Sequence, residues 1–154
     1  MDLSSLISED AIFTGLRVAS KKKLLKDLSE RAGELVGLKA QLIFDTLLER
    51  ERLGSTGLGH GFAIPHGKVP ELERVFAMVV TLDEPIDFEA VDDAPVDLFI
   101  LLLAPEAAGA DHLKALARIS RIARTPGTLD KLRAAHSASA IYAILSDFSE
   151  SDAA

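Results

Sequence analysis

Two long apolar runs in the middle of the chain most constrain how it can fold. The first extends from Val75 to Leu82 and the second from Val96 to Leu103, and a proline follows each run within three residues. A strand with one face in water alternates apolar and polar residues, whereas a nearly continuous apolar run indicates a strand that is covered on both faces. The sequence therefore predicts a buried central sheet with helices packed against it.

Residues with helical spacing flank the strand region on both sides. Leucine and alanine positions predict one helix between the cap residues Ser20 and Gly37, and a second helix from about Ala40 to Arg52. Beyond the strands, a further helix is predicted to bury a face that consists of Leu113, Leu116, Ala117, Ser120 and Ala123.

The order of these segments is helices, then strands, then helices. This order predicts an α/β fold in which a mixed β-sheet is sandwiched by helices. A single domain is expected over residues 3–148, and residues 149–154 are expected to form a flexible tail.

Composition excludes several classes of function. The chain has 154 residues, with 17 lysines and arginines against 24 aspartates and glutamates, so its formal net charge is −7. An acidic chain without a basic block is a poor nucleic-acid binder, so no nucleic-acid partner is expected. The absence of cysteine excludes disulfides, thiolate zinc sites, iron–sulfur clusters and a cysteine nucleophile. With no signal peptide and no apolar run near the ~20 residues that span a bilayer, the chain is predicted to be cytoplasmic, without membrane insertion.

A glycine-rich segment at residues 54–61 is predicted to be a loop, because four of its eight residues are glycine. It does not match the dinucleotide-binding fingerprint, since Phe62 stands where the third glycine is needed. It does not match the phosphate-binding loop of P-loop NTPases either. That motif needs four residues between its glycines and then Lys-Ser or Lys-Thr, whereas five residues separate Gly61 from Gly67 and valine follows Lys68. No nucleotide cofactor is therefore expected.

His66 is the most unusual of the four histidines. It follows a short apolar strand at 62–64 and stands between Pro65, which stiffens the backbone, and Gly67, which leaves its flank open. An imidazole held in place with open access is what a nucleophile needs. The alternative is a surface histidine in a turn. The histidines show no ligand-type spacing, so no metal site is predicted.

Arg50 and His112 are candidates for binding an anion. Arg50 lies at the end of a predicted helix, just before the glycine-rich segment, and a guanidinium holds a phosphoryl group through its fork of donors. Asp111 is expected to cap a helix whose first residue is His112, where free N–H groups and the helix dipole attract anions. Either residue could instead be an ordinary exposed residue at a helix end, and spacing alone does not bring them to His66.

Residues 50–67 closely resemble the active-site segment of the fructose/mannitol-type EIIA domains of the bacterial phosphoenolpyruvate-dependent phosphotransferase system. The Ala-Ile-Pro-His-Gly core at 63–67 is specific in this setting, and the Ser-Thr-Gly-Leu-Gly run at 55–59 is most similar to the family's nitrogen-regulatory branch. The resemblance covers nearly the whole chain through Pro-Val-Asp-Leu at 95–98, Asp-His-Leu at 111–113 and Leu-Arg-Ala-Ala at 132–135.

This resemblance implies a site and a partner. His66 matches the histidine that receives a phosphoryl group, on Nε2, from the phosphohistidine of HPr or an HPr-like carrier. His112 matches the second active-site histidine and Arg50 the active-site arginine. Arg50, and the N–H groups near Gly67 and His112, are expected to stabilise the phosphoryl oxygens. The scheme requires no metal and no cofactor.

Three functions remain open at this point. The preferred one is a regulatory phosphocarrier whose phosphorylation state selects its protein targets. The alternative is the EIIA component of a sugar transporter, which passes the phosphoryl group to an EIIB subunit. EIIB domains use a phosphocysteine, and this chain has no cysteine. It also has no membrane-spanning EIIC segment, so no fused transport domain is expected and the regulatory function is preferred. The third is a metabolite-binding or metal-dependent domain in which Pro65-His66-Gly67 is structural.

Close approach of a donor protein also requires an apolar rim around His66. The nearby candidates are Leu58, Phe62 and Ile64, of which at least one is expected to belong to the core.

Overall fold

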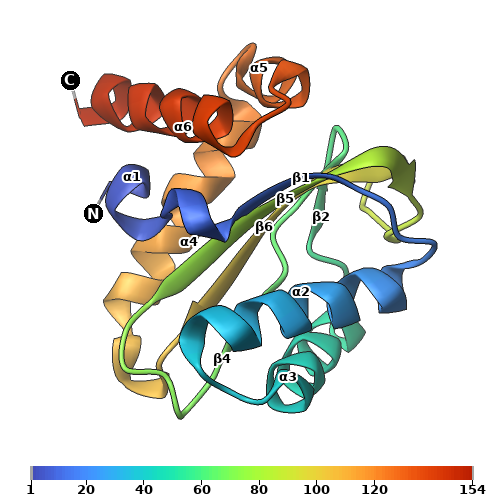
Figure 1. Cartoon of the computed structure of the whole chain (residues 1–154), viewed down its shortest axis with the longest axis vertical. Coiled ribbons are helices and arrows are strands. Elements are labelled where there is room, and N and C mark those ends of the chain that lie inside the picture. Colours follow the sequence, from blue (N-terminus) through green and yellow to red (C-terminus); the bar gives the residue numbers. More distant parts are fainter. Residues whose placement is uncertain (1, 154) are drawn as a thin grey trace.

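The computed structural model describes residues 2–153, with side chains described through residue 148. A central sheet runs through the molecule with helices on both faces (Figure 1). Its elements are α1 (Leu3–Leu6), η1 (Glu9–Ala11), β1 (Ile12–Leu16), α2 (Lys21–Val36), α3 (Ala40–Arg52), β2 (Gly57–Gly59), β3 (Phe62–Ala63), β4 (His66–Lys68), β5 (Phe76–Ile86), β6 (Val96–Ala104), η2 (Glu106–Ala108), α4 (Ala110–Arg124), α5 (Thr128–Ala134) and α6 (Ala138–Ala153).

The sheet is mixed, as the sequence predicted. Its strand order is β1-β5-β6-β3-β2, and β4 also pairs with β6. The β5–β6 pair is antiparallel, whereas β1 runs parallel to β5 and both β3 and β4 run parallel to β6. Because β3 and β4 pair with successive stretches of β6, Phe62 lies opposite Leu98 and His66 lies opposite Leu102. The central strand β6 therefore sets the position of His66.

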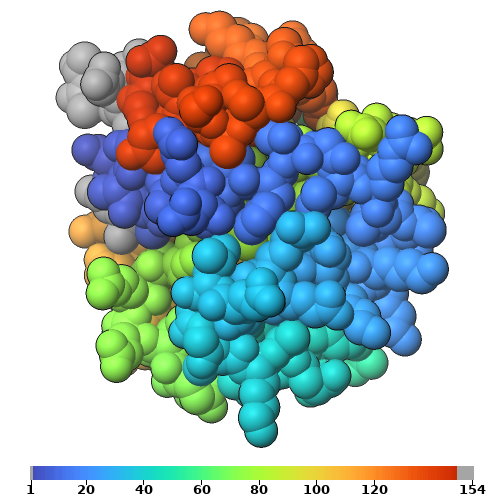
Figure 2. Space-filling view, viewed as in Figure 1, coloured from blue at the N-terminus to red at the C-terminus, as the bar shows by residue number. Residues whose placement is uncertain are grey.

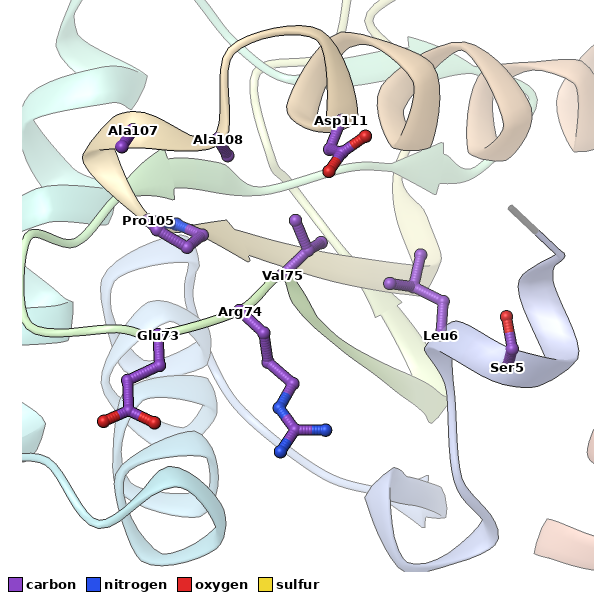
Figure 3. Close-up of a pocket in the computed structure, with 9 residues that line it drawn as sticks. All are labelled: Ser5, Leu6, Glu73, Arg74, Val75, Pro105, Ala107, Ala108 and Asp111. Carbon is purple, nitrogen blue, oxygen red and sulfur yellow. The ribbon is translucent and has the colours of Figure 1, made fainter.

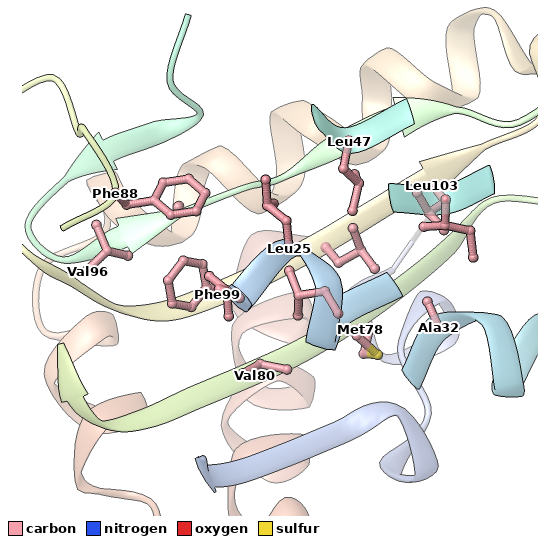
Figure 4. Packing of buried hydrophobic residues seen from close by; sticks show 14 of the residues in the cluster. Leu25, Ala32, Leu47, Met78, Val80, Phe88, Val96, Phe99 and Leu103 are labelled. Carbon is pink, nitrogen blue, oxygen red and sulfur yellow. The ribbon is translucent and has the colours of Figure 1, made fainter. Parts of the chain in front are cut away.

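From Leu98 to Ala104, strand β6 is apolar because it faces helices on both sides. Phe99, Leu101 and Leu103 pack into one cluster with α2 and α3, which Figure 4 shows around Leu25 and Leu47. The alternate β6 residues Leu98, Ile100 and Leu102 pack into a second cluster with residues of α4, α5 and α6. Alternation of side chains along a strand explains how one continuous apolar run fills two cores.

The helical predictions for α2 and α3 are confirmed. Ser20 caps α2 by accepting a hydrogen bond from the Lys23 N–H at 3.2 Å, and Gly37 ends it with a left-handed backbone, φ +74°. In Figure 2, α2 and α3 form one continuous surface, and the N-terminal segment lies between them and the C-terminal helices. The Tyr142 hydroxyl donates to the Ser4 carbonyl oxygen at 3.1 Å and so joins α6 to α1.

Several predicted boundaries were wrong. The glycine-rich segment contains a short strand, β2, which pairs with β3, and β5 continues through residues 83–86. The chain becomes extended again immediately after Pro65, so His66 begins strand β4 and does not lie in a turn. Helix α6 continues through Ala153, and residue 154 lies outside the described residues. The flexible tail expected over residues 149–154 stays a prediction.

The predicted inner face of α4 was displaced by one position. The buried residues are His112, Ala115, Ile119 and Ile122, while Leu113 is exposed. Helix α4 begins at Ala110, with Gly109 before it at φ +50°, so Asp111 does not cap it and His112 is its third residue. A glycine in this conformation turns the chain into the helix earlier than an aspartate cap would.

Candidate functional site

His66 has its two ring nitrogens in different environments. Its Nδ1 lies 2.8 Å from the Ile64 carbonyl oxygen, which only accepts hydrogen bonds, so Nδ1 carries the proton. Its Nε2 accepts a hydrogen bond from Nε of Arg50 at 3.3 Å. Nε2 is therefore the nitrogen with a free electron pair in the neutral ring. The sequence alone could not identify it.

His66 and Gly67 face opposite sides of the sheet, because successive residues of a strand alternate between its two faces. His66 is in register with Leu102, which belongs to the cluster on the α4 side, whereas Gly67 is in register with Leu103, on the α3 side. A Cβ on Gly67 would lie 2.5 Å from the Thr46 methyl group of α3, so only glycine lets this helix approach β4 so closely.

The backbone of Gly67 is directed toward β6. The Leu102 N–H donates to the Pro65 carbonyl and the Val69 N–H to the Ala104 carbonyl, and polar groups alternate in direction along a strand. The backbone N–H and carbonyl groups of Gly67 therefore point toward β6, like those of residues 65 and 69. This geometry supports a packing role for Gly67 and leaves phosphoryl stabilisation to other groups.

Arg50 is held at two points. It lies in the last turn of α3, and its NH1 group donates to the Gly54 carbonyl oxygen at 2.9 Å while its Nε reaches His66. The loop after α3 therefore fixes the plane of the guanidinium. An arginine oriented in this way presents its remaining N–H groups to an anion beside Nε2 of His66.

His112 joins the site from α4, which lies on the opposite face of the sheet from α3 and Arg50. Its ring centroid lies 5.9 Å from that of His66, with the two planes at 77°. Only 7% of the residue is exposed, and its Nε2 has no hydrogen-bond partner within the part of the chain that the structure describes. Buried polar atoms are normally satisfied, so an unpaired one beside a nucleophile indicates a place for a ligand oxygen. The first turn of α4 adds the positive end of a helix dipole.

Both histidines have lowered pKa values. Burial lowers the pKa of His66 most; the Ile64 carbonyl opposes this, Arg50 adds to it, and Glu51 opposes it. Burial also lowers the pKa of His112, with further contributions from His66 and Lys68. Both rings are therefore neutral at physiological pH, and a neutral ring is required for nucleophilic attack.

Glu51 is a buried carboxylate that the sequence analysis missed. It is 7% exposed, accepts hydrogen bonds from the N–H and the hydroxyl of Thr56, and pairs with Lys21 at 3.0 Å. The charged sequence Glu-Arg-Glu-Arg at 49–52 looked like a solvated helix end. A signal was available in Thr56, five residues later, but nothing local indicated Lys21.

The segments at 95–98 and 132–135, which both carry the family resemblance, meet beside the β2–β3 hairpin. Arg133 pairs with Asp97 at 3.0 Å and also donates to the carbonyl oxygen of His60. Asp92 holds the other side by accepting from the His60 N–H at 3.0 Å. The two contacts made with the backbone of His60 fix the hairpin to α5 and to the loop before β6.

The apolar rim differs from the expectation. Phe62 and Ile64 are buried in the core, and of the three candidates only Leu58 is exposed, at 42%. Two other leucines adjoin the site residues: Leu53, 81% exposed, follows the end of α3, and Leu113, 69% exposed, follows His112.

Five grooves of the described surface are lined by residues other than Arg50, His66 and His112. Figure 3 shows one of about 460 Å³ between the N-terminal segment, residues 73–75 and the start of α4, and its lining includes Asp111 but neither histidine. Four further grooves, of about 240 to 620 Å³, also exclude Arg50, His66 and His112 from their linings.

Among the side chains of residues 2–148, no cluster of histidine and acidic groups is arranged to hold a metal ion. No helix within residues 2–153 is long and apolar enough to cross a membrane.

Comparison with known proteins agrees with this fold. Residues 5–148 match the family described as phosphoenolpyruvate-dependent sugar phosphotransferase system, EIIA 2. The chain belongs to this family, and its α/β fold with a mixed sheet is the family's fold. Its relatives also identify the branch, which is the nitrogen-regulatory one.

Relatives in this branch are similar over most of their length. The chain is 52% identical over 145 residues to the nitrogen regulatory protein of Bradyrhizobium diazoefficiens, covering 94% of this chain and 95% of the relative. It is 44% identical over 129 residues to that of Pseudomonas aeruginosa, covering 83% and 84%. The crystal structure of the nitrogen regulatory protein IIA-Ntr from Neisseria meningitidis superposes with a TM-score of 0.88 at 32% identity, covering 93% and 98%. The IIA mannitol structure from Escherichia coli, at 20% identity and a TM-score of 0.77, shares the fold.

Proposed function

We propose that this chain is a phosphocarrier of the nitrogen-regulatory phosphotransferase system. It accepts a phosphoryl group on His66 from an HPr-like phosphohistidine donor, and its phosphorylation state then selects its regulatory protein targets in the cytoplasm. The observation that carries the proposal is the pair of contacts made by the two ring nitrogens of His66, from which we infer its tautomer. The Ile64 carbonyl holds the proton on Nδ1, which leaves the electron pair of Nε2 beside Arg50.

The proposed step is an in-line displacement between two imidazoles. The electron pair of Nε2 forms a bond to phosphorus, the phosphorus–nitrogen bond of the donor breaks, and its electron pair returns to the donor nitrogen. The proton on Nδ1 stays in place, so the phosphorylated ring is cationic and is stabilised by the Ile64 carbonyl. Because the bond formed resembles the bond broken, the transfer is close to thermoneutral. Positioning and charge stabilisation then supply most of the catalysis.

Arg50 and His112 are proposed to hold the phosphoryl oxygens. When phosphorus occupies Nε2, the Arg50 Nε–H loses its present acceptor and is free to donate to a phosphoryl oxygen. The unpaired Nε2 of His112, when it carries a proton, supplies a second donor from the opposite side. Each charge-assisted or preorganised donor of this kind is worth a few kcal/mol in the transition state, which is ~10²–10³ in rate.

Phosphorylation tests the proposal directly. The protein is incubated with phosphoenolpyruvate, enzyme I and an HPr-type carrier, and the modified residue is mapped. We expect a single acid-labile, alkali-stable label on His66. His66→Ala abolishes labelling, whereas His136→Ala, at an exposed histidine outside the site, keeps it. Labelling of His66→Ala at the wild-type rate would refute the assignment.

Regulation requires that partners distinguish the two states. A phosphoryl group adds roughly −1.5 to −2 charges at neutral pH, on a chain whose formal charge is already −7. A partner without a cation to meet this charge binds more weakly because desolvation is not compensated. Pull-downs with wild type, His66→Asp and His66→Ala are therefore expected to recover different partners. Equal recovery by all three proteins would contradict a switching role.

The second candidate function is that of a sugar-transport EIIA component. It predicts rapid onward transfer from phosphorylated His66 to the cysteine of an EIIB subunit. The run at 55–59 and the relatives named nitrogen regulatory protein support the regulatory function instead. Rapid transfer to an EIIB subunit from the same genome would favour the sugar-transport function.

A further inference from the structure

We infer that Glu51, together with Thr56, is a positioning residue that fixes the tautomer of His66. Glu51 lies at the end of α3 with both carboxylate oxygens used: Oε1 accepts from the Thr56 N–H at 3.1 Å, and Oε2 accepts from the Thr56 hydroxyl. A carboxylate that accepts two hydrogen bonds from one residue sets both the backbone and the side chain of that residue.

From Thr56, backbone hydrogen bonds lead directly to the His66 ring. The Thr56 carbonyl accepts from the Ile64 N–H at 3.0 Å, and the Ile64 carbonyl accepts from Nδ1 of His66 at 2.8 Å. Glu51 thus fixes Thr56, Thr56 fixes the peptide of Ile64, and that peptide holds the proton of His66. A shift of Thr56 would move the carbonyl that selects the tautomer.

Glu51 also supports the other nitrogen of His66, through the turn after α3. Its own carbonyl oxygen accepts from the Gly54 N–H at 3.1 Å, and the Gly54 carbonyl oxygen accepts from Arg50 at 2.9 Å. The Nε group of the same arginine reaches Nε2 of His66. Both ring nitrogens are therefore held by segments that Glu51 joins.

The position requires an ionised carboxylate. Besides Thr56, Oε1 of Glu51 meets the Lys21 ammonium at 3.0 Å, and this ammonium lies 4.6 Å from the centre of the Phe88 ring. Three donors around a buried group match the acceptor capacity of a carboxylate, whereas an amide has one oxygen and turns its NH₂ group toward a donor. Glutamine has the same shape, so Glu51→Gln changes the hydrogen bonding with little change in volume.

This inference rests on the proposed function only for the transfer rate, because the tautomer is measured without a donor. In Glu51→Gln we expect the ¹⁵N chemical shifts of the His66 ring to move from the Nδ1–H form toward a mixture with the Nε2–H form. We also expect kcat for phosphoryl transfer to fall by ~10–100-fold, as when the group that orients a functional histidine is removed, with KM for the donor unchanged. Wild type that shows the Nδ1–H form yet accepts no phosphoryl group would refute the proposed function alone.

Glu49→Gln is the matched control, since Glu49 lies on the same helix, is exposed and pairs with the exposed Arg52 at 3.7 Å. It is expected to leave the tautomer and kcat unchanged. If Glu51→Gln does not fold, Thr56→Val and Thr56→Ser replace it: the valine variant is expected to change the tautomer and kcat, and the serine variant, which keeps the hydroxyl, to behave as wild type. A folded Glu51→Gln or Thr56→Val protein with the wild-type tautomer and kcat would overturn the inference, as would equal effects of Glu49→Gln.

Discussion

Nε of Arg50 lies 3.3 Å from Nε2 of His66, so a permanent cation stands beside the one ring nitrogen that carries no proton. The contact joins the end of α3 to the start of β4 across sixteen residues of sequence. Burial lowers the pKa of His66 most, and the Arg50 cation adds to this lowering. In the function proposed above, the same contact prepares the nucleophile and offsets the charge of the phosphoryl group after transfer.

Replacing Arg50 is expected to slow phosphoryl transfer by ~10²–10³ in kcat, because one charge-assisted donor at the reacting centre is lost. Arg50→Lys is expected to be nearly as slow as Arg50→Ala. The planar guanidinium can contact the Gly54 carbonyl and the phosphoryl group at the same time, whereas the ammonium of lysine cannot. Rapid-quench measurement of single-turnover transfer checks this. Arg52→Lys, on an exposed side chain of the same helix end, serves as control. Normal transfer by both Arg50 variants would show that Arg50 has no such role.

The pH dependence of transfer follows from the lowered pKa of His66. Free histidine titrates near ~6.5, and burial shifts the pKa of His66 below that. The ring is therefore expected to stay neutral, and the transfer rate to stay constant, as pH falls to about 6.5, with loss only in more acidic solution. NMR titration of the His66 ring checks the midpoint. Arg50→Ala is expected to raise it, because a neighbouring cation is removed; a wild-type midpoint above that of free histidine would contradict the prediction.

The same shift links folding to pH. The unfolded chain binds the proton of His66 at a higher pH than the folded chain does, so the unfolded state gains protons first as the solution is acidified. The stability that His66 contributes by staying neutral is therefore fully present above its pKa in the unfolded chain. The free energy of unfolding decreases as the pH falls from that value through the lower pKa of the folded chain.

Local signals predicted much of the fold. Ser20 and Gly37 bounded α2 correctly because a cap hydrogen bond and a left-handed glycine are decided within one turn of chain. The two apolar runs predicted β5 and β6 because a strand with helices on both faces has no polar side. The short strand β4 was missed because its pairing with the distant strand β6 makes it extended, and β2 was missed because its glycines indicate a loop although it pairs with the neighbouring β3.

The site was less accessible to sequence reasoning. His66 stood out through its neighbours, but its contact with Arg50 depends on the register of β4 on β6, which no local pattern encodes. The burial of His112 was missed because Gly109 starts α4 before Asp111. Glu51 was missed because Lys21, which neutralises it, lies thirty residues earlier. Only the resemblance to a family connected the residues of the site in advance.

Gly67→Ala is expected to destabilise the protein by ~1–3 kcal/mol, the cost of inserting a methyl group into a filled space. The added Cβ would lie 2.5 Å from the Thr46 methyl group. Thr46→Ser removes this methyl group but keeps the hydroxyl that donates to the Leu42 carbonyl at 3.0 Å. The double variant is therefore expected to recover part of the lost stability. Urea unfolding of all four proteins gives the coupling energy, and additive effects would contradict the packing role.

His112→Leu is expected to separate stability from activity. The substitution removes a buried Nε2 that has no partner among the described residues, so the free energy of unfolding should stay equal or rise by up to ~1 kcal/mol. Transfer to His66 should nevertheless fall by ~10²-fold, because a donor to the phosphoryl group is lost. Ile119→Ala, in the buried face of the same helix, is expected to lose ~2–5 kcal/mol of stability. A large loss of stability in His112→Leu would indicate a structural histidine.

The exposed leucines beside the site are expected to contact the phosphoryl donor. Leu53 precedes the glycine whose carbonyl holds Arg50, and Leu113 follows His112, so both adjoin residues of the site while being 81% and 69% exposed. Covering one leucine stabilises a complex by ~1.5–3 kcal/mol, so Leu53→Glu and Leu113→Glu should each raise KM for the phosphorylated donor by ~10-fold or more with kcat little changed. Leu35→Glu is the control, because Leu35 lies at the opposite end of α2 from the Lys21–Glu51 pair. Unchanged KM in both variants, or an equal rise in Leu35→Glu, would show that the donor docks elsewhere.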